Sequence, residues 1–132
     1  MLLQYIQIFD EDPAAALVTQ RGLQAMLGDR LSISIAPTAN AAWLACARGN
    51  VDLLIVDPGV RNGPATSLIR AVRSYRPQIP ILVLTAYDTP GMRTHMRNLG
   101  VTYYAAKPIE LRDLLPSVTA ALQPASAAIP AA

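Results

Sequence analysis

Short apolar runs alternate along this chain with longer segments in which apolar residues recur every three or four positions. The apolar runs have the length of β-strands and are predicted at residues 1–9, 31–35, 52–56, 81–84 and 101–105. The longer segments have helical spacing and are predicted as helices at residues 14–27, 39–48, 66–75, 89–99 and 110–122. Strands separated by helices pair in parallel through right-handed crossovers. We therefore predict a three-layer α/β/α sandwich around a five-stranded parallel sheet.

The same pattern predicts which faces are buried. The run at residues 31–35 alternates with serine, which is typical of an edge strand. The first helix is predicted to bury Leu17, Val18, Leu23, Met26 and Leu27. The third helix is predicted to bury Leu68, Ile69 and Val72 and to leave a row of arginines in solvent, Arg70, Arg73 and Arg76.

The composition fits one globular domain. The chain has 132 residues, of which 52% are hydrophobic, which is enough to form a core. Residues 123–132 are rich in alanine and proline and lack periodicity. We therefore predict a domain over residues 1–122 and a tail, or the start of a linker, over 123–132. The single cysteine excludes an internal disulfide.

The hydropathy and the charge of the sequence limit the kinds of partner that we expect. No apolar run approaches the roughly 20 residues of a membrane-spanning helix, and the first strand lacks the features of a secretory signal, so we expect a cytoplasmic protein without membrane binding. The net charge is +2, with basic and acidic residues spread along the chain. Direct nucleic-acid binding by this domain is not expected, because it needs clustered basic residues.

The most informative stretch is VDLLIVDPGV, residues 51–60. An unbroken apolar run ends on Asp57, and Pro58 and Gly59 then stop the strand. In an open α/β sheet, ligands bind at the carboxyl ends of the strands. Asp57 is therefore the first candidate for chemistry. A cap of the following helix is the other interpretation.

Polar residues also follow other strands of the predicted sheet. They are Asp10, Glu11 and Asp12 after the first strand, Thr85 at the end of the fourth and Lys107, the only lysine, after the fifth. Carboxylates gathered at one edge repel one another unless a cation joins them, and oxygen ligands without histidine or cysteine suit Mg²⁺. A metal ion, an ammonium and a hydroxyl group around Asp57 would stabilise a phosphoryl group during its transfer onto that carboxylate.

Four motifs occur in order along the chain: IFDEDP, LLIVD, ILVLTA and YYAAKP. Through them the chain resembles, over about residues 5–122, the receiver domains of two-component response regulators. The resemblance implies the doubly wound, flavodoxin-like strand order 2-1-3-4-5. It also implies a signalling phosphoacceptor rather than a typical enzyme. Asp57 would take a phosphoryl group from a sensor histidine kinase or a phosphotransfer protein, and the domain would catalyse only its own Mg²⁺-dependent phosphotransfer and dephosphorylation.

The resemblance also implies a metal site. Mg²⁺ would be bound by Asp57, by Asp10 and Glu11, directly or through water, and by the backbone carbonyl of Gly59. The family usually has aspartate where Glu11 stands, and Asp12 is an alternative ligand if the longer side chain does not fit.

The remaining implied roles concern the switch. Lys107 would pair with the phosphate, and Thr85 would swing to hydrogen-bond the phosphate. The bond between Lys107 and Pro108 would be cis. Tyr104 falls where the family places an aromatic side chain that turns inward when the threonine moves. The fourth helix, fifth strand and fifth helix would form the surface for a homodimer or an output.

Two alternatives remain open from the residues. The loop PGVRNGPA lacks the methionine–proline pair usual in the family, and a pseudo-receiver would keep the fold and bind partners with weak or no phosphorylation. A flavodoxin-like enzyme or nucleotide binder would have a glycine-rich phosphate loop after the first strand, where this chain has DEDP.

Overall fold

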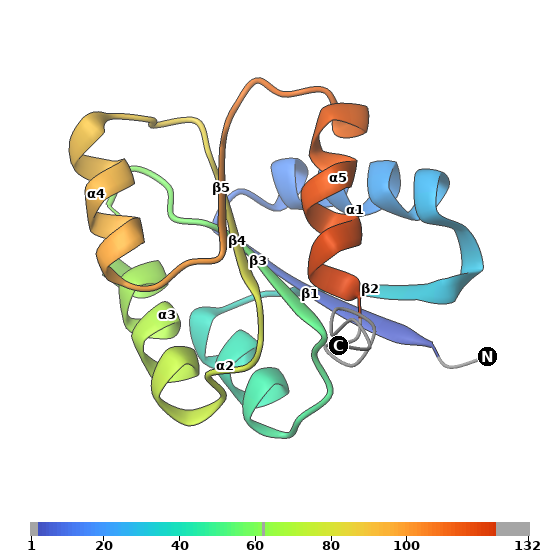
Figure 1. Cartoon of the computed structure of the whole chain (residues 1–132), viewed down its shortest axis with the longest axis horizontal. Coiled ribbons are helices and arrows are strands. Elements are labelled where there is room, and N and C mark those ends of the chain that lie inside the picture. Colours follow the sequence, from blue (N-terminus) through green and yellow to red (C-terminus); the bar gives the residue numbers. More distant parts are fainter. Residues whose placement is uncertain (1–2, 62, 124–132) are drawn as a thin grey trace, which may run out of the picture.

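The computed structural model describes residues 3–61 and 63–123. Its five strands form one parallel sheet in the order β2-β1-β3-β4-β5 (Figure 1). They are β1 (Gln4–Asp10), β2 (Leu31–Ala36), β3 (Leu53–Asp57), β4 (Ile81–Thr85) and β5 (Tyr103–Ala106). The predicted fold and strand order are confirmed, and the serine-rich strand lies at an edge. The predicted tail from residue 124 onward and the first two residues of the first predicted strand lie outside the described residues.

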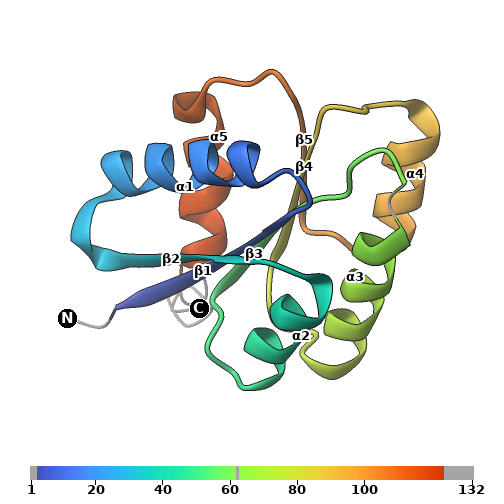
Figure 2. The same ribbon diagram turned by 180° about the vertical axis from the view of Figure 1, so that it is seen from behind.

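Helices cover both faces of the sheet. Helices α1 (Pro13–Leu27) and α5 (Leu111–Leu122) lie on one face, and α2 (Ala39–Ala47), α3 (Gly63–Tyr75) and α4 (Pro90–Asn98) lie on the other, as the two opposite views show (Figures 1 and 2). A short 3₁₀ helix, η1 (Gly28–Arg30), joins α1 to β2. No helix within residues 3–61 and 63–123 combines the length and apolar character that crossing a membrane would take.

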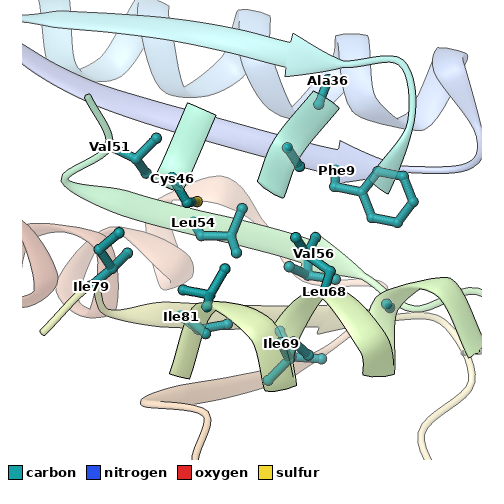
Figure 3. Close-up of a cluster of buried hydrophobic side chains, with 14 of the residues drawn as sticks. Phe9, Ala36, Cys46, Val51, Leu54, Val56, Leu68, Ile69, Ile79 and Ile81 are labelled. Atoms are coloured by element: carbon teal, nitrogen blue, oxygen red, sulfur yellow. The ribbon is translucent and has the colours of Figure 1, made fainter. Parts of the chain in front are cut away.

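The core consists of two apolar layers, one on each face of the sheet. Figure 3 shows the layer under α2, α3 and α4, where Leu54 and Val56 of β3 pack with Leu68 and Ile69 of α3. All five residues of β3 are buried, because this strand has a neighbour on each side and helices on both faces. The end of β3, where Asp57 stands, is therefore held rigidly.

The buried face of α1 differs from the prediction. The helix buries Ala16, Thr19 and Leu23. Three of the residues predicted to be buried are exposed: Leu17, Val18 and Met26. Two of the three buried residues, Ala16 and Thr19, are small, and Gly22 lies so close to the Leu111 side chain of α5 that a Cβ there would collide with it. A pattern of large apolar residues does not reveal contacts that small residues make.

The arginine row of α3 is also corrected. Leu68, Ile69 and Val72 are buried as predicted, and Arg70 is exposed. Arg73, however, donates hydrogen bonds to the carbonyls of Gly100 and Ile79 (both 2.6 Å) and Pro77 (3.2 Å), and to Thr102 Oγ1 (3.0 Å). Arg76 likewise donates to the carbonyl of Ala47 at 2.7 Å. Long polar side chains can reach back over a helix to satisfy neighbouring loops, which sequence spacing alone does not reveal.

Asp12 begins α1. Its Oδ1 accepts hydrogen bonds from the backbone N–H groups of Ala14 (3.0 Å) and Ala15 (3.3 Å), which is the geometry of an N-cap. Oδ1 of Asp12 is thus engaged in holding α1.

This cap gives a prediction for stability. Asp12→Ala should lower the free energy of unfolding by about 1 kcal/mol, because two N–H groups lose their acceptor. Glu110→Ala is the matched control, since the Glu110 side chain stands at the N-cap of α5 without a capping hydrogen bond to any described residue. Its ion pair with Arg112 is exposed and should contribute less than about 0.5 kcal/mol. Equal losses for the two variants in urea unfolding would contradict the cap.

Candidate functional site

Two carboxylates lie side by side at the carboxyl edge of the sheet. Asp10 and Asp57 are register partners at the ends of β1 and β3. Asp57 is only 8% exposed, and its Oδ1 accepts a hydrogen bond from the backbone N–H of Gly59 at 2.9 Å. Gly59 has φ +65°, a left-handed backbone conformation that glycine adopts more easily than other residues. The glycine at this position therefore permits the tight turn after Asp57. The turn orients the Asp57 carboxylate toward its neighbours.

Lys107 joins both carboxylates. Its Nζ lies 2.7 Å from Asp57 Oδ2 and 3.6 Å from Asp10 Oδ2. The backbone N–H of Lys107 donates to the carbonyl of Thr85 at 2.7 Å, and the bond to Pro108 is cis, as the resemblance implies. Burial opposes protonation, but the hydrogen bond and charge of Asp57 and the charge of Asp10 raise the pKa of Lys107 overall. The side chain is therefore a firmly protonated ammonium at neutral pH.

The negative charge of Asp10 is less well compensated by Lys107 than the charge of Asp57 is. Burial raises the pKa of Asp10, and the negative charge of Asp57 raises it further. These effects outweigh the hydrogen bond from the backbone N–H of Asp12 at 2.9 Å and the charge of Lys107. One ammonium thus serves two neighbouring carboxylates, and an additional cation would favour the ionised form of both.

The site opens into a surface cleft of about 410 Å³. Its lining includes Asp10, Glu11, Asp57 and Lys107, together with Gly59, Val60, Arg61, Ala86 and Tyr87. Within residues 3–61 and 63–123, no three carboxylate, imidazole or thiol groups come close enough together to form a metal-binding group. Asp10 and Asp57, which are neighbours at the ends of β1 and β3, could hold Mg²⁺ directly, and exposed Glu11 could act through water. Mg²⁺ usually takes one or two carboxylates and keeps several waters, so these residues fit it.

Thr85 lies beside the site and not against the carboxylates. It is fully buried, and its Oγ1 accepts a hydrogen bond from the backbone N–H of Tyr87 at 3.0 Å. The described residues include no hydrogen bond from the Thr85 hydroxyl to Asp57 or Lys107. In this structure the Thr85 hydroxyl oxygen is therefore engaged by its own loop.

Tyr104 has its hydroxyl at the molecular surface. The Tyr104 Oη donates a hydrogen bond to Asp88 Oδ1 at 2.8 Å. The carboxylate of Asp88 also binds Arg93 through both oxygens, with Nε to Oδ1 at 2.8 Å and Nη2 to Oδ2 at 2.7 Å. In this structure the Tyr104 hydroxyl therefore points outward, while the half-buried residue packs against the core layer under α2, α3 and α4.

Comparison with known proteins identifies the family of the chain. The family model described as response regulator receiver domain matches residues 6–119. The chain belongs to the response regulator receiver domain family. Over 119 residues, 89% of this chain, it is 29% identical to the DNA-binding transcriptional regulator NtrC of Bradyrhizobium sp. (strain RP501 Parasponia). The chain spans about a quarter of the length of that regulator, since it covers 24% of it.

Solved structures share the fold of this receiver domain. A CheY-like response regulator receiver domain protein from Methanospirillum hungatei JF-1 is 26% identical, with a TM-score of 0.79 over 91% of this chain and 94% of that one. The receiver domain of the sensor histidine kinase PA1611 from Pseudomonas aeruginosa PAO1 is 20% identical, with a TM-score of 0.79 over 91% of this chain and 98% of that one. That protein has a magnesium ion coordinated in its active-site cleft.

Sequence reasoning did not find two residues of this receiver domain, Asp88 and Arg93. The hydrogen bonds from Arg93 and then Tyr104 lower the pKa of Asp88, and Asp88 raises the pKa of Arg93. Burial and then the bond to Asp88 raise the pKa of Tyr104 to about 12. An acid and an arginine five positions apart are common, so only the fold reveals that both meet Tyr104.

Proposed function

We propose that Asp57 is the phosphoryl acceptor of this receiver domain, with the domain extending over residues 1–122. The donor would be the phosphohistidine of a sensor histidine kinase or of a phosphotransfer protein. The observation that carries the proposal is the 2.7 Å contact between Lys107 Nζ and Asp57 Oδ2, made inside a cleft that Asp10 also lines. An ammonium held against one buried carboxylate at an open cleft is suited to charge that arrives with a phosphoryl group.

In the proposed transfer, an Asp57 carboxylate oxygen attacks phosphorus while the bond from phosphorus to the donor imidazole breaks. The transition state spreads negative charge over the phosphoryl oxygens, so positioning and nearby positive charge supply most of the catalysis. Lys107 would remain within reach of those oxygens. The Gly59 N–H would keep its hydrogen bond to Oδ1 and fix the carboxylate for in-line attack.

Asp10, Asp57 and the backbone carbonyl of Gly59 would hold Mg²⁺, with Glu11 acting through water. When bound, Mg²⁺ supplies positive charge to the phosphoryl oxygens. The raised pKa of Asp10 supports this assignment, because a second cation compensates the carboxylate that Lys107 serves least well.

Thr85 and Tyr104 would couple the phosphorylated site to the surface. Thr85 would move toward the phosphoryl group, and Tyr104 would turn inward into the space near Thr85. These movements would shift the balance between two states of the protein surface. That surface is formed by α4, β5 and α5 and would serve a homodimer or an output. We expect the domain to work in the cytoplasm and to make no direct contact with nucleic acid.

The proposal is tested with a small phosphodonor such as acetyl phosphate. With Mg²⁺ present, intact mass should increase by one phosphoryl group, and chelation of Mg²⁺ should abolish the gain. Asp57→Asn is the control because it keeps the shape of the side chain and removes the nucleophile. No gain by a folded protein, or an equal gain by Asp57→Asn, would contradict the proposal and leave an interaction module of the same fold.

A further inference from the structure

A network of three side chains joins three elements next to the cleft. Asp88 lies in the loop between β4 and α4, Arg93 in α4 and Tyr104 in β5. Besides the three hydrogen bonds on Asp88, the Arg93 guanidinium lies over the Tyr104 ring, with Cζ 5.3 Å from the ring centroid. We call these three residues the Asp88 latch.

The latch stabilises one position of Tyr104. The hydroxyl and the ring both contact groups on the solvent side, since the side chains of Arg93 and Asp88 are 54% and 25% exposed. An inward turn of Tyr104 would break the hydrogen bond to Asp88 and separate the ring from Arg93. Hydrogen bonds to an ionised acceptor are stronger than neutral ones, and the two bonds from Arg93 hold the acceptor in place. Each contact therefore favours the outward position.

The latch is also connected to the proposed phosphorylation site. Asp88 follows Thr85 by three residues, and the N–H of the intervening Tyr87 donates to Thr85 Oγ1. The Thr85 carbonyl accepts the N–H of Lys107. A shift of Thr85 toward Asp57 would therefore also displace the loop that carries Asp88.

We propose that Asp88 is a positioning residue that holds Tyr104 outward and thereby opposes phosphorylation of Asp57. The inference rests on the proposed function, in which the phosphorylated state has Tyr104 turned inward. Coupling between two sites is reciprocal, so a contact that favours the outward position disfavours the phosphorylated state by the same factor. Loss of Asp88 should release Tyr104 and favour ligands of the phosphorylated state.

The test is a titration with beryllofluoride, a phosphate mimic, in the presence of Mg²⁺. Asp88→Ala should bind the mimic about three- to tenfold more tightly than the unchanged protein, as expected for the loss of charge-assisted contacts at a partly exposed site. Asp88→Asn keeps an acceptor for Tyr104, and its affinity for the mimic should lie between those of the unchanged protein and Asp88→Ala. Asp29→Ala removes an exposed carboxylate of η1, outside α4, β5 and α5, that has no ion pair among the described residues, and it should leave the affinity unchanged.

A double-mutant cycle separates the latch from a general structural role. Tyr104→Phe removes the hydroxyl and should reproduce most of the gain of Asp88→Ala. Combining the two changes should add little, because both remove the same hydrogen bond. Unchanged or weaker binding of the mimic by folded Asp88→Ala, or fully additive effects in the cycle, would overturn the inference.

The position of Tyr104 can be measured without phosphorylation. In an Asp57→Asn background, the ring resonances of Tyr104 should shift in Asp88→Ala toward those of a buried ring and remain unchanged in Asp29→Ala. A ring that stays outward overturns the latch whatever Asp57 does. A ring that turns inward supports the latch, even if acetyl phosphate fails to modify the unchanged protein and the proposed function is lost.

Discussion

Replacing Lys107 with alanine should slow the acceptance of a phosphoryl group by Asp57 by roughly tenfold or more, as expected when a charged donor is removed from a developing anion. Lys107 Nζ is the group that contacts the Asp57 carboxylate, and its side chain is largely shielded from solvent, so water replaces it poorly. The change also leaves Asp10 and Asp57 next to each other without their shared cation. The rate is measured by intact mass during incubation with acetyl phosphate and Mg²⁺.

Lys107→Arg is the matched variant, because it keeps the charge and changes its shape. A planar guanidinium cannot take the place of a compact ammonium between two carboxylates, so the rate should lie between those of the unchanged protein and Lys107→Ala. A rate for Lys107→Ala equal to that of the unchanged protein would show that the Lys107 contact has no part in the transfer.

The second large effect concerns stability. Arg73→Ala should lower the free energy of unfolding by about 2–3 kcal/mol, because several hydrogen bonds from one charged group are lost together. Arg73 ties α3 to the loops before β4 and β5, through the carbonyls of Ile79 and Gly100 and the hydroxyl of Thr102. The loss is measured by urea unfolding, followed through the fluorescence of Trp43.

Arg70→Ala is the control on the same helix. Arg70 is exposed and has no ion pair among the residues that the structure describes, so its loss should change stability by less than about 0.5 kcal/mol. Arg73→Lys should recover little, because one ammonium cannot reproduce a fork that reaches three carbonyls and a hydroxyl. Equal stabilities of Arg73→Ala and Arg70→Ala would rule out this role for Arg73.

The sequence was sufficient for the sheet because its central strands, β3 and β4, are buried on both faces and read as unbroken apolar runs. A run such as LLIV has one plausible place in a parallel sheet, and the polar residue that ends it must then lie at the carboxyl edge. Asp10, Asp57 and Lys107 could be brought together in this way without knowledge of any side-chain geometry. Their distances and the pKa shifts of Asp10 and Lys107 needed the structure.

Features that depend on side-chain reach were not predictable. Arg73 has the same spacing as exposed Arg70, yet only the fold places three loop carbonyls within its reach. The buried face of α1 includes Ala16 and Thr19, and Gly22 lies against Leu111 of α5, so residues outside the pattern of large apolar side chains make these contacts. No sequence pattern singles out Asp88, and only the structure shows that its carboxylate accepts a hydrogen bond from Tyr104.

Asp57 is expected to carry the phosphoryl group, and the most direct measurement is the identity of the modified residue. Protein treated with acetyl phosphate and Mg²⁺ is reduced with borohydride, which converts an aspartyl phosphate to homoserine, and the peptides are then sequenced by mass spectrometry. The account predicts homoserine at position 57. Homoserine at position 10 or 12, or at no position in a protein that has gained the mass of a phosphoryl group, would contradict it.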